Sequence, residues 1–377
     1  MTGRAGSGAA LAAAALLLAA CAGTAPPAAV ATGPSPGSAA VAPIPQAPGR
    51  GALVLHGGGE DAAGFAERVA ALAGAGRHLC VIDTADDEGG DSRAMFAHLA
   101  GLTLTRLAPA AADAASPAVV AALEGCTGFY FGGGAPQRLS DTFLTPAGDS
   151  PALAVIRRKF QREGAVVSGA SAGAMILGPV TLCECGPQSS LAAVQAGQLT
   201  QAAGFGFLDG TLIDAHALAR GLIGRELVAM ERNALPRVLA IDEGTAVVVP
   251  PDPAAPWEVI GGRWAALLTR NGPEGATLDL LAPGDRFHPA ERHFDLAPGA
   301  DAPPGAAAET GKAPADAVAP YAAVALAGTV ALTGKPASAA IGGGPARLAF
   351  APGPGMRFRG RGGEPFSLLG ALVRIER

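Results

Sequence analysis

The chain is poor in charge and has no basic segment. Charged residues make up 16% of the 377 residues, and the formal net charge is −5. Proteins that bind nucleic acid usually carry a basic patch or tail, so the composition argues against nucleic acid as a partner. Hydrophobic residues make up 49%, a share typical of a globular protein with a buried core rather than of a disordered chain.

Cysteine pairs with metal-binding spacing and glycine-rich phosphate motifs are also missing. Cys183 and Cys185 are separated by one residue, which is the wrong spacing for a zinc site, and no second pair accompanies them. Neither G-x-G-x-x-G nor a Walker loop occurs. We therefore expect no metal and no cofactor. Cys80 and Cys126 lie in apolar segments, which predicts two buried thiols.

The apolar run near the N-terminus is too short to span a bilayer. It covers residues 9–20, follows Arg4 and leads into Leu-Ala-Ala-Cys at 18–21. This ending resembles the lipobox of bacterial lipoproteins, in which the cysteine is acylated and becomes the mature N-terminus. The resemblance implies that residues 1–21 are a signal peptide and that a lipid on Cys21 anchors the protein in the cell envelope. The anchor would lie at the periplasmic face, in the outer membrane of a Gram-negative cell. An ordinary cleaved signal with an incidental cysteine is the alternative.

Residues 22–50 and 51–287 differ in composition. The first segment is mainly alanine, glycine, proline, serine and threonine, cannot bury a core, and is predicted to be a spacer. In the second segment, apolar strand patterns alternate with helical patterns. Strands are expected at 52–56, 79–82, 128–131, 165–167 and 211–214, and helices at 65–73, 95–102, 117–123 and 152–162. This alternation predicts an α/β fold with a doubly wound, mostly parallel sheet that is covered on both faces.

Three of these strands lead into glycine-rich turns, at 57–59, 132–134 and 169–173. Ligands of parallel sheets bind at the carboxyl ends of the strands, so the three turns are expected to meet at one pocket. The third turn matches G-x-S-x-G between a strand and a helix, the pattern of a nucleophile elbow. Ser171 is therefore the candidate nucleophile. The backbone N–H of Ala172, at the start of the next helix, is a candidate oxyanion donor.

A serine nucleophile needs a base, and two histidines are suitably placed in the sequence. His56 ends the strand at 52–56, and His216 follows the strand pattern at 211–214. The other four histidines lie outside the expected pocket or in a polar segment. From the residue pattern alone, His56 and His216 are equal candidates for the general base.

Several segments together resemble the cyanophycinase and aspartyl dipeptidase (dipeptidase E) family of serine peptidases. They occur in the order of the family and fall within residues 51–287. The segments are 53–60 (LVLHGGGE), 131–139 (FGGGAPQRL), 169–174 (GASAGA), 204–216 (GFGFLDGTLIDAH) and 241–248 (IDEGTAVV). The resemblance implies a flavodoxin-like fold related to the class I glutamine amidotransferases, and a peptidase with a Ser-His-Glu triad.

The family motifs imply a catalytic role for each matching residue. Ser171 would be the nucleophile. His216, rather than His56, would be the general base. Glu243 would be the carboxylate that orients the base and stabilises its charged form. The second glycine turn would supply another oxyanion donor, the backbone N–H of Gly133.

The residues expected to bind substrate match the family only in part. Arg220 and Arg225 correspond to two of three arginines that grip the substrate in the family, and with Asp214 they are the candidate substrate-binding residues. Solvated helix positions are the alternative for both arginines. Three departures alter the rest of the pocket: Ala135-Pro136 in place of Asp-Gln, Ala215 in place of Gln, and Leu222 in place of the third Arg. Cyanophycin is therefore not expected to be the substrate.

The C-terminal part carries no catalytic motif. Residues 288–320 are predicted to be a linker, with many alanines and prolines between 301 and 320. Residues 321–377 hold short apolar runs separated by glycine and proline, at 324–327, 330–332, 348–350 and 368–375. These runs predict a small β-rich appendage of two hairpins.

The sequence thus predicts an envelope peptidase that acts on a peptide and contacts the membrane through its lipid. A homodimer is also expected. Two alternatives stay open. One is a catalytically silent peptide-binding protein on the same fold. The other is an esterase of α/β-hydrolase type, which the His-Gly-Gly-Gly run at 56–59 favours. The chain order argues against the esterase, because its histidine comes last whereas His216 precedes Glu243.

Overall fold

The computed structural model describes residues 49–74, 76–273, 275–302, 314–360 and 365–377, all within one compact unit. Cys21, the predicted signal peptide and the spacer up to residue 48 lie outside the described residues. Among the helices that are described, none is both long and apolar enough to cross a membrane.

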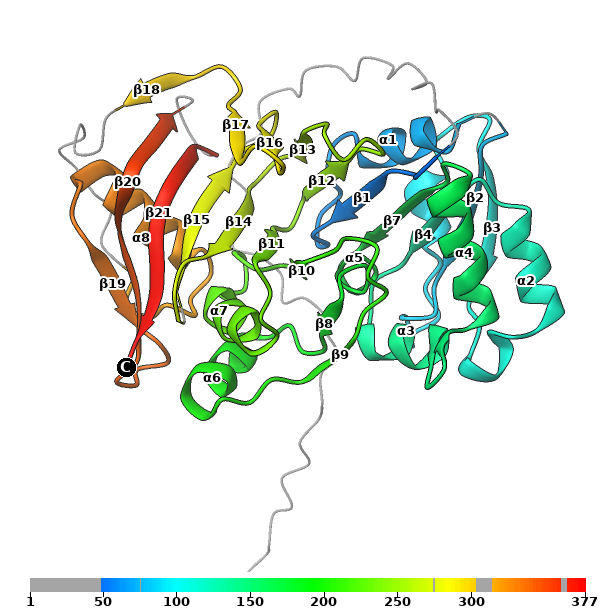
Figure 1. Ribbon diagram of the computed structural model, residues 1–377, viewed down its shortest axis with the longest axis horizontal. Helices are drawn as coiled ribbons and strands as arrows, with labels where there is room; N and C mark the ends of the chain where they lie inside the picture. Colours follow the sequence, from blue (N-terminus) through cyan, green and yellow to red (C-terminus); the bar gives the residue numbers. More distant parts are fainter. Residues whose placement is uncertain (1–48, 75, 274, 303–313, 361–364) are drawn as a thin grey trace, which may run out of the picture. The chain divides into compact units, whose positions relative to one another are not determined.

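Within the described residues, the first sheet has nine strands in the order β17-β16-β13-β12-β1-β7-β4-β2-β3 (Figure 1). Strands β1, β7, β4, β2 and β3 are parallel neighbours, and the other four extend the sheet from β1 in antiparallel pairs. The strands are β1 (Leu53–His56), β2 (His78–Ile82), β3 (Thr103–Leu107), β4 (Gly128–Phe131), β7 (Val166–Ala170), β12 (Thr245–Val249), β13 (Trp257–Gly261), β16 (Arg286–His288) and β17 (His293–Asp295). The predicted α/β class is confirmed.

Helices cover both faces of the parallel strands. Leu53 and Leu55 of β1 join a core with α2 and α4, while Val54 between them joins a core with α1, as the alternation of strand side chains requires. The α2 helix begins where the sequence predicts, because the Ser116 hydroxyl accepts a hydrogen bond from the N–H of Val119. The helices and 3₁₀ turns are α1 (Phe65–Leu72), η1 (Ser92–Phe96), η2 (Ala111–Asp113), α2 (Pro117–Glu124), α3 (Pro136–Phe143), α4 (Pro151–Arg162) and α5 (Ala172–Met175).

A second sheet has the order β10-β11-β14-β15-β21-β20-β18, with β19 paired to β20. Among its described strands, β10 and β11 alone form a parallel pair. Its strands are β10 (Thr211–Ala215), β11 (Arg237–Ile241), β14 (Ala265–Arg270), β15 (Gly275–Leu281), β18 (Ala300–Ala302), β19 (Ala337–Ala340), β20 (Arg347–Gly360) and β21 (Ser367–Glu376). Its core is shared with α6 (Pro187–Ala196), α7 (Ile223–Arg232) and α8 (Ala322–Thr333). Two short hairpins complete the described elements: β5 (Leu144–Thr145) with β6 (Gly148–Asp149), and β8 (Val180–Leu182) with β9 (Gln201–Ala203).

The C-terminal region is β-rich, but it is built differently from the prediction. The apolar runs at 324–327 and 330–332 lie in helix α8, not in strands. Strands β20 and β21 continue the second sheet through β15, so residues 321–377 share a core with the rest of the domain and do not form a separate appendage. The predicted linker at 288–320 contributes strands β17 and β18 before residue 303.

The prediction of two buried thiols is wrong for Cys80 and Cys126, which form a disulfide. Cys80 lies on β2, and Cys126 precedes the neighbouring parallel strand β4, whose residue Gly128 pairs with Leu79. This register brings the two Cα atoms to 5.8 Å, within the usual range for a disulfide. Cys183 is a free cysteine.

Candidate active site

Four strand ends from the two sheets meet at one place. Strands β1, β7, β10 and β11 end just before Gly57, Ser171, His216 and Asp242. Backbone hydrogen bonds join these ends: the N–H of Ser171 donates to His56 O at 3.0 Å, and the N–H of His216 donates to Gly57 O at 3.2 Å. The end of β1 and its glycine turn therefore connect the two sheets next to the predicted nucleophile and base.

Ser171 occupies a sharp turn between β7 and α5. Its φ is 52° and its ψ is −121°, a conformation that costs energy for a residue with a side chain. The flanking glycines are required by close packing. A Cβ on Gly169 would lie 2.2 Å from Gly173 O, and one on Gly173 would lie 2.0 Å from Phe131 O. The strand, turn and helix thus have the geometry of a nucleophile elbow.

The structure brings Ser171, His216 and Glu243 into one hydrogen-bonded chain. Ser171 Oγ lies 2.8 Å from His216 Nε2, and His216 Nδ1 lies 2.8 Å from Glu243 Oε1. A carboxylate can only accept, so Nδ1 carries the proton that is donated to Glu243. This tautomer leaves Nε2 free to accept the proton of the Ser171 hydroxyl.

His56, the other candidate base, has a different environment. Its Nε2 accepts a hydrogen bond from the N–H of Ala62 at 3.2 Å, and its ring lies 5.0 Å from that of Phe65. Burial lowers its pKa from 6.5 to about 4, so the ring is neutral near pH 7. His216, and not His56, is therefore the histidine within hydrogen-bonding distance of Ser171 Oγ.

Two glycines of the turn after β1 lie directly against the base and the acid. A Cβ on Gly58 would lie 2.5 Å from His216 Cε1, and a Cβ on Gly59 would lie 2.8 Å from Glu243 Cβ. Both glycines have positive φ, 81° and 69°. The sequence predicted only that this turn reaches the pocket. The packing of His216 and Glu243 against this turn could not be predicted, because it depends on contacts between segments far apart in the chain.

The electrostatics of the site keep Glu243 ionised. The hydrogen bond from His216 lowers the pKa of Glu243 below its ordinary value, burial opposes this, and the nearby charge of Arg220 adds to the lowering. Arg220 Nε donates to Glu243 Oε1 at 3.2 Å. The carboxylate can therefore orient the imidazole and stabilise its protonated form.

Asp242 is a buried acid beside this chain that the sequence did not single out. Its Oδ1 accepts a hydrogen bond from the N–H of Ala219 at 2.9 Å, while its Oδ2 has no partner among the described residues. Burial raises the pKa of Asp242 from 3.8 to about 7. The acid is therefore protonated in weakly acidic solution, in contrast to the neighbouring Glu243.

The two predicted oxyanion donors flank Ser171. Ala172 is the first residue of α5, so its N–H has no carbonyl partner one turn back in the helix. A Cβ on Gly133 would lie 3.4 Å from Ser171 Cβ and 4.0 Å from its Oγ. The neighbouring N–H groups of Gly132 and Ala135 donate to backbone carbonyls instead.

The structure contradicts substrate binding by Arg225 and Asp214. Their side chains are 1% and 0% exposed. Arg225 Nη2 donates to both Asp214 oxygens, at 2.7 and 2.8 Å, and Nη1 donates to Ser189 Oγ at 3.1 Å. Glu226 is buried beside them, and burial together with Asp214 raises its pKa well above 4.5. Arg225 faces the interior from the first turn of α7, which helical spacing alone did not reveal. Of the predicted substrate-binding residues, Arg220 alone lies at the site.

The C-terminal region borders the site through Tyr321. Its N–H donates to Leu218 O at 2.8 Å, within the loop that carries His216 and Arg220. The guanidinium of Arg263 lies 5.5 Å from the centre of the Tyr321 ring. Burial and the nearby Asp242 carboxyl raise the pKa of Tyr321, so its hydroxyl stays protonated. The sequence had no motif that would place this residue here.

Comparisons with known proteins find similarity to a peptidase family and to cyanophycinases. Residues 89–255, which include Ser171, His216 and Glu243, match the family model of peptidase family S51. A cyanophycinase from a Nostoc species is 27% identical over 198 residues, covering 47% of this chain and 62% of its own. A cyanophycinase from Synechococcus elongatus is 29% identical over 141 residues, and the match covers 37% of this chain and 42% of the length of that protein.

Solved structures give weaker similarities. A peptidase from an acI-B1 Actinobacterium has a TM-score of 0.49 and 23% identity, covering 64% of this chain and 97% of that chain. A putative peptidase E protein from Listeria monocytogenes has a TM-score of 0.35 and 17% identity, and the match covers 56% of this chain and 98% of that chain.

Residues 89–255 of this α/β chain are therefore similar to peptidase family S51. The curated relatives that it resembles, at 27–29% identity, are cyanophycinases. The chain spans 62% of the length of the Nostoc cyanophycinase that it matches. Among the described residues, no group of three or more histidine, cysteine, aspartate or glutamate side chains is arranged to hold a metal ion.

Proposed function

We propose that the protein is a serine peptidase that hydrolyses peptide or isopeptide bonds with Ser171 as nucleophile, His216 as base and Glu243 as the orienting acid. The observation that carries the proposal is the hydrogen-bonded chain of these residues, with two contacts of 2.8 Å. This arrangement supports the proposal, because acyl transfer by a serine requires a base within hydrogen-bonding distance of the hydroxyl and an acid that orients the base.

The proposed reaction has two steps. Ser171 Oγ attacks the carbonyl carbon while His216 Nε2 takes the hydroxyl proton, and the N–H groups of Ala172 and Gly133 stabilise the oxyanion. His216 then gives the proton to the leaving amine, so the peptide bond breaks and an ester with Ser171 remains. In the second step His216 activates a water, which hydrolyses the ester and restores the serine.

We propose a short peptide as the substrate, and not cyanophycin. Arg225 is unavailable because it is paired inside the protein, and Arg220 Nε already donates to Glu243. A substrate carboxylate thus meets fewer donors than the family pattern supplies. Each hydrogen bond that is lost from a buried polar group costs about 1–3 kcal/mol, so several losses would lower activity on cyanophycin by orders of magnitude.

A panel of short peptides, including acidic and isopeptide-linked ones, tests the activity. We expect release of product from at least one of them by the wild type. Ser171→Ala should lower kcat by ~10³-fold or more while leaving the fold intact. Binding without turnover by the wild type would instead support a silent peptide-binding protein, and turnover of esters alone would support an esterase.

We further propose that the protein is held at the cell envelope by a lipid on Cys21. Support comes from the sequence, where a charged start, a short apolar run and Leu-Ala-Ala-Cys occur in order. The low-complexity segment that follows would act as a spacer between the lipid and the catalytic domain.

A further inference from the structure

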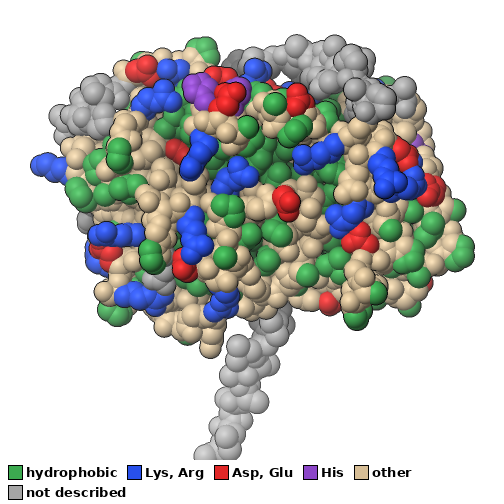
Figure 2. Space-filling model, viewed as in Figure 1, with side chains coloured by type: hydrophobic (Ala, Val, Ile, Leu, Met, Phe, Trp, Pro, Cys, Tyr) green, Lys and Arg blue, Asp and Glu red, His purple; other side chains and the backbone are tan. Residues whose placement is uncertain are grey.

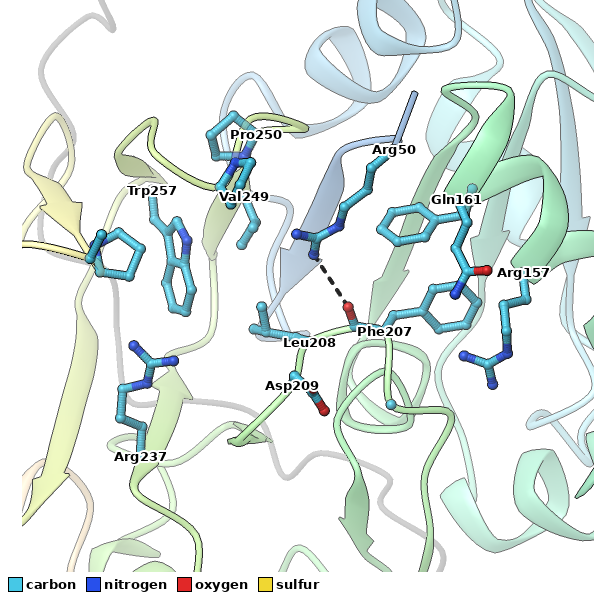
Figure 3. Close-up of a pocket in the computed structure, with 15 residues that line it drawn as sticks. Arg50, Arg157, Gln161, Phe207, Leu208, Asp209, Arg237, Val249, Pro250 and Trp257 are labelled. Atoms are coloured by element: carbon cyan, nitrogen blue, oxygen red, sulfur yellow. Dashed lines mark hydrogen bonds between the residues drawn. The ribbon is translucent and has the colours of Figure 1, made fainter. Parts of the chain in front are cut away.

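Ser171 follows the carboxyl end of β7, whereas a cavity of about 610 Å³ lies at the amino ends of β1, β10 and β11. Its lining includes Arg50, which precedes β1, Leu208, which precedes β10, and Arg237, which begins β11 (Figure 3). Ser171 and His216 follow the carboxyl ends of β7 and β10, so the cavity is separate from the proposed active site. Its volume is in the range of sites for small ligands and short peptides.

The cavity is basic. Three arginines line it, Arg50, Arg157 and Arg237, against one acidic residue, Asp209. Figure 2 shows this face of the molecule, where basic side chains surround a hydrophobic hollow. Arg237 also lines a neighbouring cavity of about 670 Å³ together with Arg270 and Arg292, which extends the basic surface.

Two of the three arginines have donors to spare. Arg157 is bound to the Asp149 carboxylate through two hydrogen bonds. Among the described residues, the Arg50 side chain donates only to Phe207 O, at 3.3 Å (Figure 3). Arg237 makes no side-chain hydrogen bond to any described residue, and its Nε is buried. Burial lowers the pKa of Arg50 and of Arg237, which means that both charges are poorly solvated and that an anion beside them would be stabilised.

Aromatic rings hold the guanidinium groups in place. Arg50 lies 5.3 Å from the centre of the Phe160 ring, and Arg237 lies 5.6 Å from that of Trp257. Stacking on a ring leaves the edge of a guanidinium free to bind a carboxylate through two hydrogen bonds. Figure 3 shows Arg50 and Arg237 on opposite sides of the cavity, with the apolar side chains of Leu208 and Val249 between them.

We propose that this cavity binds a short acidic peptide, with one carboxylate on Arg50, another on Arg237 and an apolar side chain on Leu208 and Val249. A compact phosphate would require guanidinium groups that converge on one point, whereas these two are separated by apolar surface. The site is distinct from the triad, so it is expected to bind its ligand whether or not Ser171 is active.

Calorimetry on the full-length Ser171→Ala protein tests the proposal without hydrolysis of the ligand. The probe is acetyl-Glu-Leu-Glu-amide, and acetyl-Gln-Leu-Gln-amide is its neutral counterpart. We expect saturable binding of the acidic peptide, with at least tenfold weaker binding of the neutral one. Peptide binding should also change the fluorescence of Trp257, and this change should be lost in Trp257→Phe.

Variants locate the site. Arg50→Gln and Arg237→Gln should each weaken binding of the acidic peptide at least tenfold, while Arg237→Lys, which keeps the charge, should weaken it less. Arg347→Gln, at an exposed position bonded to Ser338, makes the same charge change and should leave the affinity unaltered. In the Ser171 enzyme, Arg237→Gln should leave peptide hydrolysis unchanged.

Four results would overturn the proposal. The first is equal affinity for the acidic and neutral peptides. The second is unaltered affinity in both glutamine variants when they retain the native circular dichroism. The third is binding of inorganic phosphate as tightly as the acidic peptide, which would reveal a general anion site. The fourth is binding to phosphatidylglycerol vesicles without binding of the peptide, which would reveal a membrane-facing surface.

Discussion

Gly58 lies against the imidazole of His216, so closely that a Cβ on Gly58 would be 2.5 Å from His216 Cε1 and 2.8 Å from Nε2. The proposed general base is therefore positioned by a backbone from another part of the chain. Its position depends on the absence of a side chain at residue 58.

This contact predicts that Gly58→Ala lowers kcat/KM about 100-fold, because displacement of a catalytic group by about 1 Å has an effect of that size. Gly64→Ala is a matched control. Gly64 has the same φ of 81°, but a Cβ there would meet nothing within 4 Å. Both variants should lose about 1–2 kcal/mol of stability from the backbone conformation. Equal kcat/KM in the two variants, measured on one peptide, would contradict the positioning role of Gly58.

Asp242 predicts a particular dependence of stability on pH. Its pKa in the folded protein is about 7, above the ordinary value of 3.8, so the folded state binds the proton more tightly than the unfolded state. The stability contributed by the neutral acid is complete below pH 3.8 and is lost as pH rises to about 7.

Asp242→Asn should remove this dependence, because the amide stays neutral and can still accept from Ala219. The variant should be more stable than the wild type at pH 8, by up to about 4 kcal/mol, and nearly equal to it at pH 4. Urea unfolding across this pH range measures the difference. If the free energy of unfolding changed with pH in the same way in the two proteins, Asp242 would not titrate as expected.

Arg225 and Arg220 should respond differently to substitution. Arg225→Met leaves Asp214 without its partner in the interior, so we expect a loss of about 3–5 kcal/mol in the free energy of unfolding. Arg220→Gln removes a partly exposed group that contacts Glu243, so it should lower kcat with a stability change below about 1 kcal/mol. A raised KM in Arg225→Met at unaltered stability would restore Arg225 as a substrate-binding residue.

Lipid anchoring predicts that Cys21→Ala moves the protein from the membrane fraction to the soluble envelope fraction, because the apolar run is too short to span a bilayer. Cys183→Ala is the control, since it removes the free cysteine of the described region and should leave fractionation as it is. Membrane association of Cys21→Ala equal to that of the wild type would argue for an ordinary signal peptide.

Much of the fold around Ser171 could be predicted, because its signals are local. Apolar strands that end in glycine turns gave the positions of β1, β4 and β7, and the strict spacing of G-x-S-x-G marked the turn at Ser171. The serine before Pro117 predicted the start of α2. Each of these features depends on residues that are neighbours in the sequence.

The remaining features depend on contacts between distant segments. The runs of apolar residues at 324–332 fit a strand or a helix equally well, and packing under β20 and β21 decides for the helix. The disulfide of Cys80 depends on the register of β2 with β4. The inward direction of Arg225 becomes evident only when Asp214, on a different element, is seen to face it.

Labelling of Ser171 by a fluorophosphonate probe, mapped by mass spectrometry of the tryptic peptides, tests directly whether Ser171 is an activated nucleophile. We predict a single labelled serine, Ser171, in the wild type and in His56→Ala. We also predict no labelling in Ser171→Ala and a labelling rate lowered by ~10²-fold or more in His216→Ala, because the base is needed to activate the hydroxyl. Labelling at full rate in His216→Ala, or none in a folded wild-type protein, would contradict the assignment of Ser171, His216 and Glu243 as a catalytic unit.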